Sequence, residues 1–360
     1  MSITDGFMIP LDFNDWKNYG DRTSWCSTQP WWTNQNISLQ GSSLGPTEVK
    51  LGETVKVAVG IQGVAGTGGA TVSVTVRNVQ AWACYPSPTA GSTSQSLLLP
   101  SMTTSNPAFT GSVLIEGVNP ALFPGSYQNT SAPFPYALFP LLGPWTPTSA
   151  DLMPPNTEVH CCLIATSAGA NLEGTSLGTM VPSDSDLASL IDICTSPYQG
   201  QCNISIISLP LHKFPGGLLV QEFGFLVAGL NVAPAEVGVD VSPVEQANGI
   251  DPAVLRSLKG GPYAGLDLKP ATSGLKGYSL AKNPYKLTEP LSKIVRPAEK
   301  MTESGTSLRL SLPSGGIQPL LLRVEVDAAS KLGSVYAFDI VQTDAGGKRG
   351  GIRVGAVVVQ

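Results

Sequence analysis

The composition of this 360-residue chain is typical of a β-rich globular protein and excludes a nucleic-acid-binding one. Hydrophobic residues make up 42% of the chain, and 39 Gly and 30 Pro are spread along it without a collagen period. Charged residues make up only 13%, against about 25% in an average globular protein. The formal net charge is −5, so the chain lacks the basic footprint that binds phosphates, and we expect no nucleic-acid partner.

The charge is unevenly distributed. Residues 1–212 contain 5 Lys or Arg and 13 Asp or Glu, a net charge of −8, and residues 213–360 contain 16 and 13, a net charge of +3. The chain begins with acidic residues where a secretory signal would have a basic and then an apolar region. No run reaches the roughly 18 apolar residues of a membrane span. We therefore expect no membrane insertion, and the sequence leaves open whether the protein is cytoplasmic or reaches a cell surface by another route or after processing.

Residues 1–46 form an aromatic, irregular arm that contains four of the six tryptophans. One interpretation is that the indoles are buried against an edge of the first folded domain, as tryptophans mostly are. The other is that they form an exposed surface that stacks on sugars or docks a partner. The candidate binding surface comprises Trp25, Trp31, Trp32, Phe134, Tyr136 and Trp145.

Strand periodicity begins after the arm. Apolar residues alternate with small or polar ones over residues 55–61 and again over residues 72–76, around a glycine-rich connection. The same alternation occurs over residues 308–312 and 320–326, and residues 335–359 read as a terminal hairpin with glycines at its reversal. The sequence predicts an all-β fold of two immunoglobulin-like antiparallel β-sandwich domains with long loops and few short helices. We expect an arm at residues 1–46, a first domain at 47–212 and a second at 213–360, divided at the HKFPGG linker.

Several of these patches resemble one family. The runs PWWTNQNISL, VKVAVGIQGVAGTGGATVSVTV, HCCLIA with CNISII, and VYAFDIVQTDAGGKRGGIRV are similar to segments of uncharacterised bacterial proteins whose immunoglobulin-like domains resemble CARDB adhesion-type modules. Asn36 stands where that family usually has an acidic residue. The resemblance implies two sandwich domains, paired strands around the small-residue turn, and no known catalytic residues.

Residues 157–211 hold most of the residues that could support chemistry. This stretch contains His160, Cys161, Cys162, Cys194 and Cys202. Neighbouring residues on a strand point to opposite faces, so His160 and Cys161 do not form a nucleophile and base pair. The cysteine spacing matches no standard zinc pattern. A disulfide between Cys194 and Cys202, which would close a short loop, is a better candidate than a metal site and requires an oxidising compartment. We expect Cys26, Cys84 and Cys161 to be small buried hydrophobes.

These observations favour a non-catalytic protein. We expect a structural or interaction protein of the adhesion type, a subunit of a bacterial surface or multi-subunit assembly, without cofactor, metal or catalytic residues. Its expected partners are proteins, including copies of itself, and a glycan ligand stays open. Two alternatives remain: a carbohydrate-binding protein that uses the N-terminal tryptophans, and a hydrolase centred on the His160 stretch.

Overall fold

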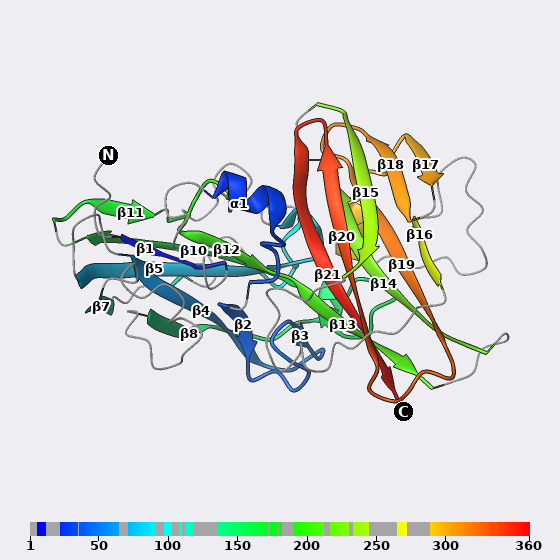
Figure 1. Cartoon of the computed structure of the whole chain (residues 1–360), viewed down its shortest axis with the longest axis horizontal. Helices are drawn as coiled ribbons and strands as arrows, with labels where there is room; N and C mark the ends of the chain where they lie inside the picture. The colour runs from blue at the N-terminus through cyan, green and yellow to red at the C-terminus, as the bar shows by residue number, and fades with distance from the viewer. Residues whose placement is uncertain are drawn as a thin grey trace.

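The fold is almost entirely β, as the sequence predicts (Figure 1). A computed structural model describes residues 6–11, 22–34, 36–64, 71–90, 97–102, 108–109, 113–118, 136–171, 173–178, 180–181, 191–211, 217–229, 233–244, 265–271, 289–304 and 306–360. Within these residues the helical elements are short: α1 (Thr23–Thr28), the 3-10 helix η6 (Ser149–Asp151) and α3 (Glu289–Ile294).

The N-terminal half, β1 to β12, contains two antiparallel sheets. In the first, β4 (Val55–Val64) pairs with β1 (Gly6–Met8) and β2 (Ile37–Gln40) along one side and with β8 (Tyr136–Trp145) along the other. In the second, β5 (Thr71–Cys84) pairs with β10 (Cys162–Asn171). The outer strands are β6 (Ala108–Phe109) and β7 (Val113–Val118) beside β5, and β11 (Ser176–Gly178) and β12 (Gln199–Cys202) beside β10. A short ladder joins β3 (Glu48–Val49) to β9 (Val159–His160).

A first core lies between these two sheets. It includes Val55, Val57, Val59, Ile61, Val74, Val76, Ala81, Val159, Cys161 and Leu163. The alternation predicted from the sequence is therefore confirmed for β4 and for the described side chains of β5. The expected pairing of these two strands around their glycine-rich turn is wrong, because β4 and β5 lie in different sheets. Periodicity reports which face of a strand is buried, but not which strand lies beside it.

The N-terminal arm covers the other face of the β5 and β10 sheet. Trp82 of β5 and Ile164 of β10 point away from the first core and belong to a separate apolar cluster, here called the arm cluster. The arm cluster consists of Leu11, Cys26, Trp31, Trp32, Trp82, Cys84, Ala90, Leu98, Cys162, Ile164, Val181, Ile191 and Ile193. The second sheet is thus buried on both faces, which explains why residues 79–84 of β5 and the loop after it are buried without interruption.

The C-terminal half, β13 to β21, is a second sandwich. Its larger sheet has the order β13 (Ile204–Pro210), β21 (Gly347–Val359), β20 (Val335–Asp344), β15 (Ala235–Pro243), β18 (Ser307–Leu312) and β17 (Lys300–Ser304). Its smaller sheet has the order β14 (Leu218–Ala228), β19 (Ile317–Asp327) and β16 (Gly265–Pro270). The predicted terminal hairpin is confirmed by the antiparallel pairing of β20 with β21, and β13 runs parallel to β21. The second core lies between the sheets and includes Phe225, Val239, Leu308, Leu310, Leu312, Leu322, Ile340 and Val354.

One continuous run of chain connects the two halves. Strand β12 ends at Cys202 in an N-terminal sheet, and β13 begins at Ile204 in the larger C-terminal sheet. Asn203, between them, donates its backbone N–H to Trp32 O and its Nδ2 to Gly351 O. The domain boundary expected at residue 212 stays a prediction, but the change of sheet already occurs at Asn203.

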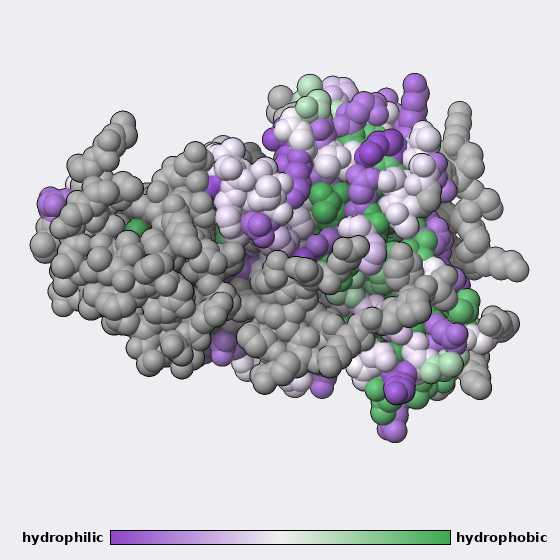
Figure 2. Space-filling model, in the orientation of Figure 1, coloured by the Kyte–Doolittle hydropathy of each residue, from purple (hydrophilic) through white to green (hydrophobic). Residues whose placement is uncertain are grey.

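The surface of the C-terminal half is mixed in character. In Figure 2, hydrophobic side chains over these sheets are interspersed with hydrophilic ones. Among the described residues, the exposed large hydrophobic side chains are Leu51, Met180, Leu211 and Leu332. No helix in the described ranges is long and apolar enough to cross a bilayer.

Candidate functional site

The most distinctive polar arrangement surrounds His160, where the two halves meet. His160 of β9 lies directly opposite Glu48 of β3 in the antiparallel ladder. Val49 and Val159, the other members of this ladder, belong to the first core. Because successive side chains on a strand point to opposite faces, Glu48 and His160 are directed away from the first core. The backbone of Ile206 in β13 donates a hydrogen bond to Glu48 Oε1, so this carboxylate contacts both halves.

His160 lies between two carboxylates. Its Nδ1 is 3.1 Å from Glu48 Oε1, and its Nε2 is 3.6 Å from Glu158 Oε2. The His160 residue is 3% exposed, and its ring makes an edge contact with Phe223 of β14 at a centroid distance of 5.6 Å. Burial alone lowers the pKa of a histidine, but the interactions with Glu158 and Glu48 outweigh it and raise the pKa of His160 to about 9. The same contact with His160 lowers the pKa of Glu158 to about 2.

These charges determine what chemistry the site can perform. At neutral pH His160 is an imidazolium, which has no free lone pair to accept a proton from a nucleophile. Burial raises the pKa of the Cys161 thiol and raises that of Cys162 to about 12, so neither is a thiolate at neutral pH. Cys161 belongs to the first core and Cys162 to the arm cluster, on opposite faces of the sheet. The arrangement fits an ion-paired junction better than a nucleophilic centre.

A cleft with a volume of about 220 Å³ opens beside His160 and Glu158. Its walls come from the segment that leads into β9 and from strands β13 and β14, so both halves contribute. The lining residues are Asn156, Thr157, Glu158, His160, Ile207, Ser208, Pro210 and Gln221. Most of them carry amide, hydroxyl or charged groups. Among the described residues, no group of His, Cys, Asp and Glu has an arrangement that would hold a metal ion.

The tryptophan surface predicted from the sequence is wrong for the side chains that are described. Trp31, Trp32 and Trp145 are 3%, 2% and 4% exposed, and Trp145 Nε1 donates to Ser101 Oγ. Trp25 is half-buried and packs against the arm cluster. These indoles are buried because they cover apolar faces of the N-terminal sheets. Of the other two candidates, Tyr136 begins β8 but its side chain lies outside the described residues, as does Phe134 entirely.

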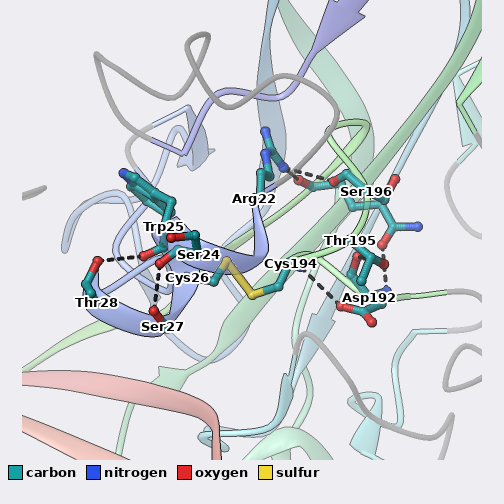
Figure 3. Close-up of a disulfide and its surroundings, with 11 residues drawn as sticks. Arg22, Ser24, Trp25, Cys26, Ser27, Thr28, Asp192, Cys194, Thr195 and Ser196 are labelled. Carbon is teal, nitrogen blue, oxygen red and sulfur yellow. Dashed lines mark hydrogen bonds between the residues drawn. A yellow bond between two sulfur atoms is a disulfide. The ribbon is translucent and has the colours of Figure 1, made fainter. Parts of the chain in front are cut away.

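The predicted disulfide between Cys194 and Cys202 is also wrong. Cys194 is bonded to Cys26 of α1, with a Cα–Cα distance of 5.8 Å (Figure 3), which lies in the usual range for disulfides. Cys202 is a free thiol buried in the first core, so its side chain is committed to the space between the N-terminal sheets. The disulfide instead attaches the arm to the turn before β12.

Arg22 strengthens the same attachment (Figure 3). It is 1% exposed, its Nη1 donates to Ser196 O and Gln199 O, and its Nη2 donates to Ile9 O. The arm is therefore fixed to the second sheet by a covalent bond and by a buried guanidinium.

Sequence reasoning missed Glu48, Glu158 and Cys26 as partners. Glu158 stands two residues before His160, so strand phase was an available signal that their side chains share a face. The partners Glu48 and Cys26 are far from His160 and Cys194 in the sequence, and no local pattern indicates either contact.

Comparisons with known proteins give no family. No protein-family model and no curated protein sequence matches the chain. Solved structures with some likeness include the CupB6 tip adhesin from Pseudomonas aeruginosa, at 13% identity and a TM-score of 0.21 over 99% of this chain and 98% of that one. The enterotoxigenic E. coli adhesin CfaE is 8% identical with a TM-score of 0.23 over 99% and 86%. The N-terminal domain of PorA is 9% identical with a TM-score of 0.24 over 43% and 87%. At TM-scores this low, the similarity to these structures does not assign a function to this chain.

Proposed function

We propose that this chain is a non-catalytic structural or interaction protein of the adhesion type, a subunit of a bacterial surface or other multi-subunit assembly. The observation that carries the proposal is the way in which the two halves are joined. Leu226, Ala228, Leu291 and Ile317 belong to the C-terminal half, yet their side chains are part of the first core. A protein whose two sandwiches share a core holds its outer loops and edge strands in fixed relative positions, as a building block or a presented binding module requires.

The chemistry of the His160 stretch supports the same proposal. Its histidine is held as an imidazolium between two carboxylates, and its thiols are buried. The Cys26–Cys194 disulfide supports a surface or extracellular location, since disulfides form and persist in oxidising compartments.

Contacts in the proposed assembly are polar and involve sheet edges. In the described part of the chain, β17 is the last strand of the larger C-terminal sheet, and its side chains are mostly exposed. An edge strand offers unpaired backbone groups that a second copy of the chain can extend. Among the described residues, only a few large hydrophobic side chains are exposed, so this part of the surface offers no large apolar interface.

The test is the state of the full-length oxidised protein at micromolar concentration, by light scattering after size exclusion and by electron microscopy. We expect defined oligomers, rings or filaments. Lys300→Glu on β17 is expected to shift their midpoint concentration upward about tenfold or more, whereas Lys331→Glu, the same change in the exposed turn after β19, should leave it unchanged. A monodisperse monomer at all concentrations overturns the proposal, and equal effects of the two variants exclude β17 as the contact.

A further inference from the structure

The cleft beside His160 has the features of a ligand site. Residues 156–160 of the N-terminal half form one wall, and Ser208 of β13 and Gln221 of β14 contribute to the other. His160 is almost fully buried, but it still lines this space. The side chain of Glu158 is 39% exposed, so part of its carboxylate is accessible.

The ion pair at this cleft is not internally satisfied. The 3.6 Å between His160 Nε2 and Glu158 Oε2 exceeds the length of an ordinary hydrogen bond. The other ring nitrogen, Nδ1, is buried and has no partner with hydrogen-bond geometry, although Glu48 lies nearby. Nδ1 faces Glu48 and not the cleft, so the pair that concerns a ligand is Nε2 of His160 and the carboxylate of Glu158. This donor and this acceptor have opposite charges and lie too far apart for an ordinary hydrogen bond, so a third group can bridge them. A hydroxyl group fits both, because it accepts from one and donates to the other.

The rest of the lining has the same dual character. Asn156 and Gln221 carry amides, and Thr157 and Ser208 carry hydroxyls, so each of them both donates and accepts. The lining contains no Lys or Arg. The two charged lining groups, Glu158 and His160, have opposite signs, so an ionic ligand would be attracted by one of them and repelled by the other. A neutral ligand with several hydroxyls meets neither repulsion.

The volume restricts the ligand further. The cleft measures about 220 Å³, below the roughly 300 to 1,000 Å³ of pockets that enclose drug-sized ligands. It therefore suits one small ring.

We propose that the junction cleft between the two halves binds a neutral polyhydroxyl ligand of about the size of a monosaccharide, held by Glu158 and His160 on one side and by Ser208 and Gln221 on the other. This site is separate from the buried tryptophans, and its ligand contacts both halves. The inference goes beyond the proposed assembly role and does not depend on it.

The experiment uses the full-length oxidised protein and a fixed set of probes: glucose, galactose, mannose, N-acetylglucosamine, butylammonium and acetate. Binding is measured by saturation-transfer NMR and by calorimetric titration. We expect at least one sugar to bind saturably with a Kd of about 1 mM or tighter, and neither ion to compete with it. Glu158→Gln should weaken binding about tenfold or more, because it removes the charged acceptor.

Two further variants keep the result interpretable. Ser208→Ala leaves the ion pairs intact and should weaken binding about threefold or more, which covers the case in which Glu158→Gln perturbs the fold. Glu303→Gln makes the same chemical change on the exposed strand β17 and should leave binding unchanged. The proposal is overturned if no sugar binds at about ten times the expected Kd, if butylammonium or acetate occupies the cleft instead, or if both cleft variants bind as the parent does. None of these outcomes bears on the oligomeric state, so the two proposals fail separately.

Discussion

At the scale of single residues, His160 makes this protein less stable at alkaline pH. Its pKa is raised from the ordinary value of 6.5 to about 9 in the folded state. A raised pKa means that the folded state binds the proton more tightly, so the stabilisation is complete below pH 6.5 and is lost as the pH rises through 9. A shift of this size corresponds to about 3 kcal/mol. The lowered pKa of Glu158 arises from the same contact with His160, so no further free energy is added for it here.

We therefore predict that the free energy of unfolding, measured by urea titration, falls by about 3 kcal/mol between pH 6 and pH 10. His160→Gln should be less stable at pH 6 and should lose most of this dependence. The control is His212→Gln, which changes the chain's other histidine and should keep the parental profile. If the His160→Gln profile has the parental slope above pH 6.5, the assigned ion pairs do not stabilise the fold.

Glu158 predicts a second pH effect, of the opposite sign. Its pKa is lowered to about 2 by His160, so its contribution is present above pH 4.5 and is lost as the pH falls towards 2. Its side chain is 39% exposed, and solvent screening makes the contribution smaller than the shift suggests. Glu158→Gln should flatten the acid limb of the unfolding curve between pH 4.5 and 2 relative to Glu303→Gln. Identical acid limbs in the two variants would contradict the contact.

At the scale of elements, the arm is attached by contacts that no local sequence pattern indicates. The disulfide joins residues separated by 168 positions, and the loop-entropy model assigns about 5 kcal/mol to a loop of that length. We predict that Cys26→Ser and Cys194→Ser each lower the free energy of unfolding by several kcal/mol, and that reduction of the parent has the same effect. Peptide mapping without reduction should recover the Cys26 and Cys194 peptides joined. Recovery of a Cys194–Cys202 pair would refute this connectivity.

The arm also depends on a close contact with β21. A Cβ added at Gly351 would lie 2.4 Å from Trp32 Cε2, closer than side-chain atoms pack. Gly351→Ala should therefore displace Trp32 and cost about 1 to 3 kcal/mol, with a change in tryptophan fluorescence. Gly229→Ala is the matched control, since its added Cβ would have no neighbour closer than 3.7 Å. Equal melting temperatures for the two variants would show that Trp32 does not occupy this position.

Individual strands were predictable, whereas their partners were not. Alternation over residues 55–61 and 308–312 is a local signal, and the structure confirms both strands because their alternating apolar side chains face the first and the second core. Pairing depends on contacts far apart in sequence, such as Ile204 beside Arg353 in β13 and β21. The glycine-rich connection after β4 is compatible with a hairpin or with a crossing between sheets, and only the packed core selects the crossing. The same reason explains the site: His160 was recognisable, but its partner Glu48 is defined by the ladder of β3 with β9.

At the scale of the whole molecule, the shared core determines how the protein unfolds. Leu226 of β14 is fully buried, and it packs in the first core although its strand belongs to the smaller C-terminal sheet. Separating the halves would expose it together with Ala228 and Ile317. Because exposing these apolar side chains to water is unfavourable, the folding of the two sandwiches is linked.

We predict one calorimetric transition for the oxidised protein, with agreement between the calorimetric and van't Hoff enthalpies. Leu226→Ala should cost about 2 to 5 kcal/mol and should lower hydrogen-exchange protection in β4 and β5 as much as in β15. Val354→Ala, a truncation inside the second core, is the comparison. If the two halves unfold as one cooperative unit, this variant also lowers the protection of the most strongly protected amides in the N-terminal half. Two separate transitions, or protection in β4 that neither variant changes, would mean that the halves fold independently. The rigid joint on which the proposed assembly role rests would then be absent.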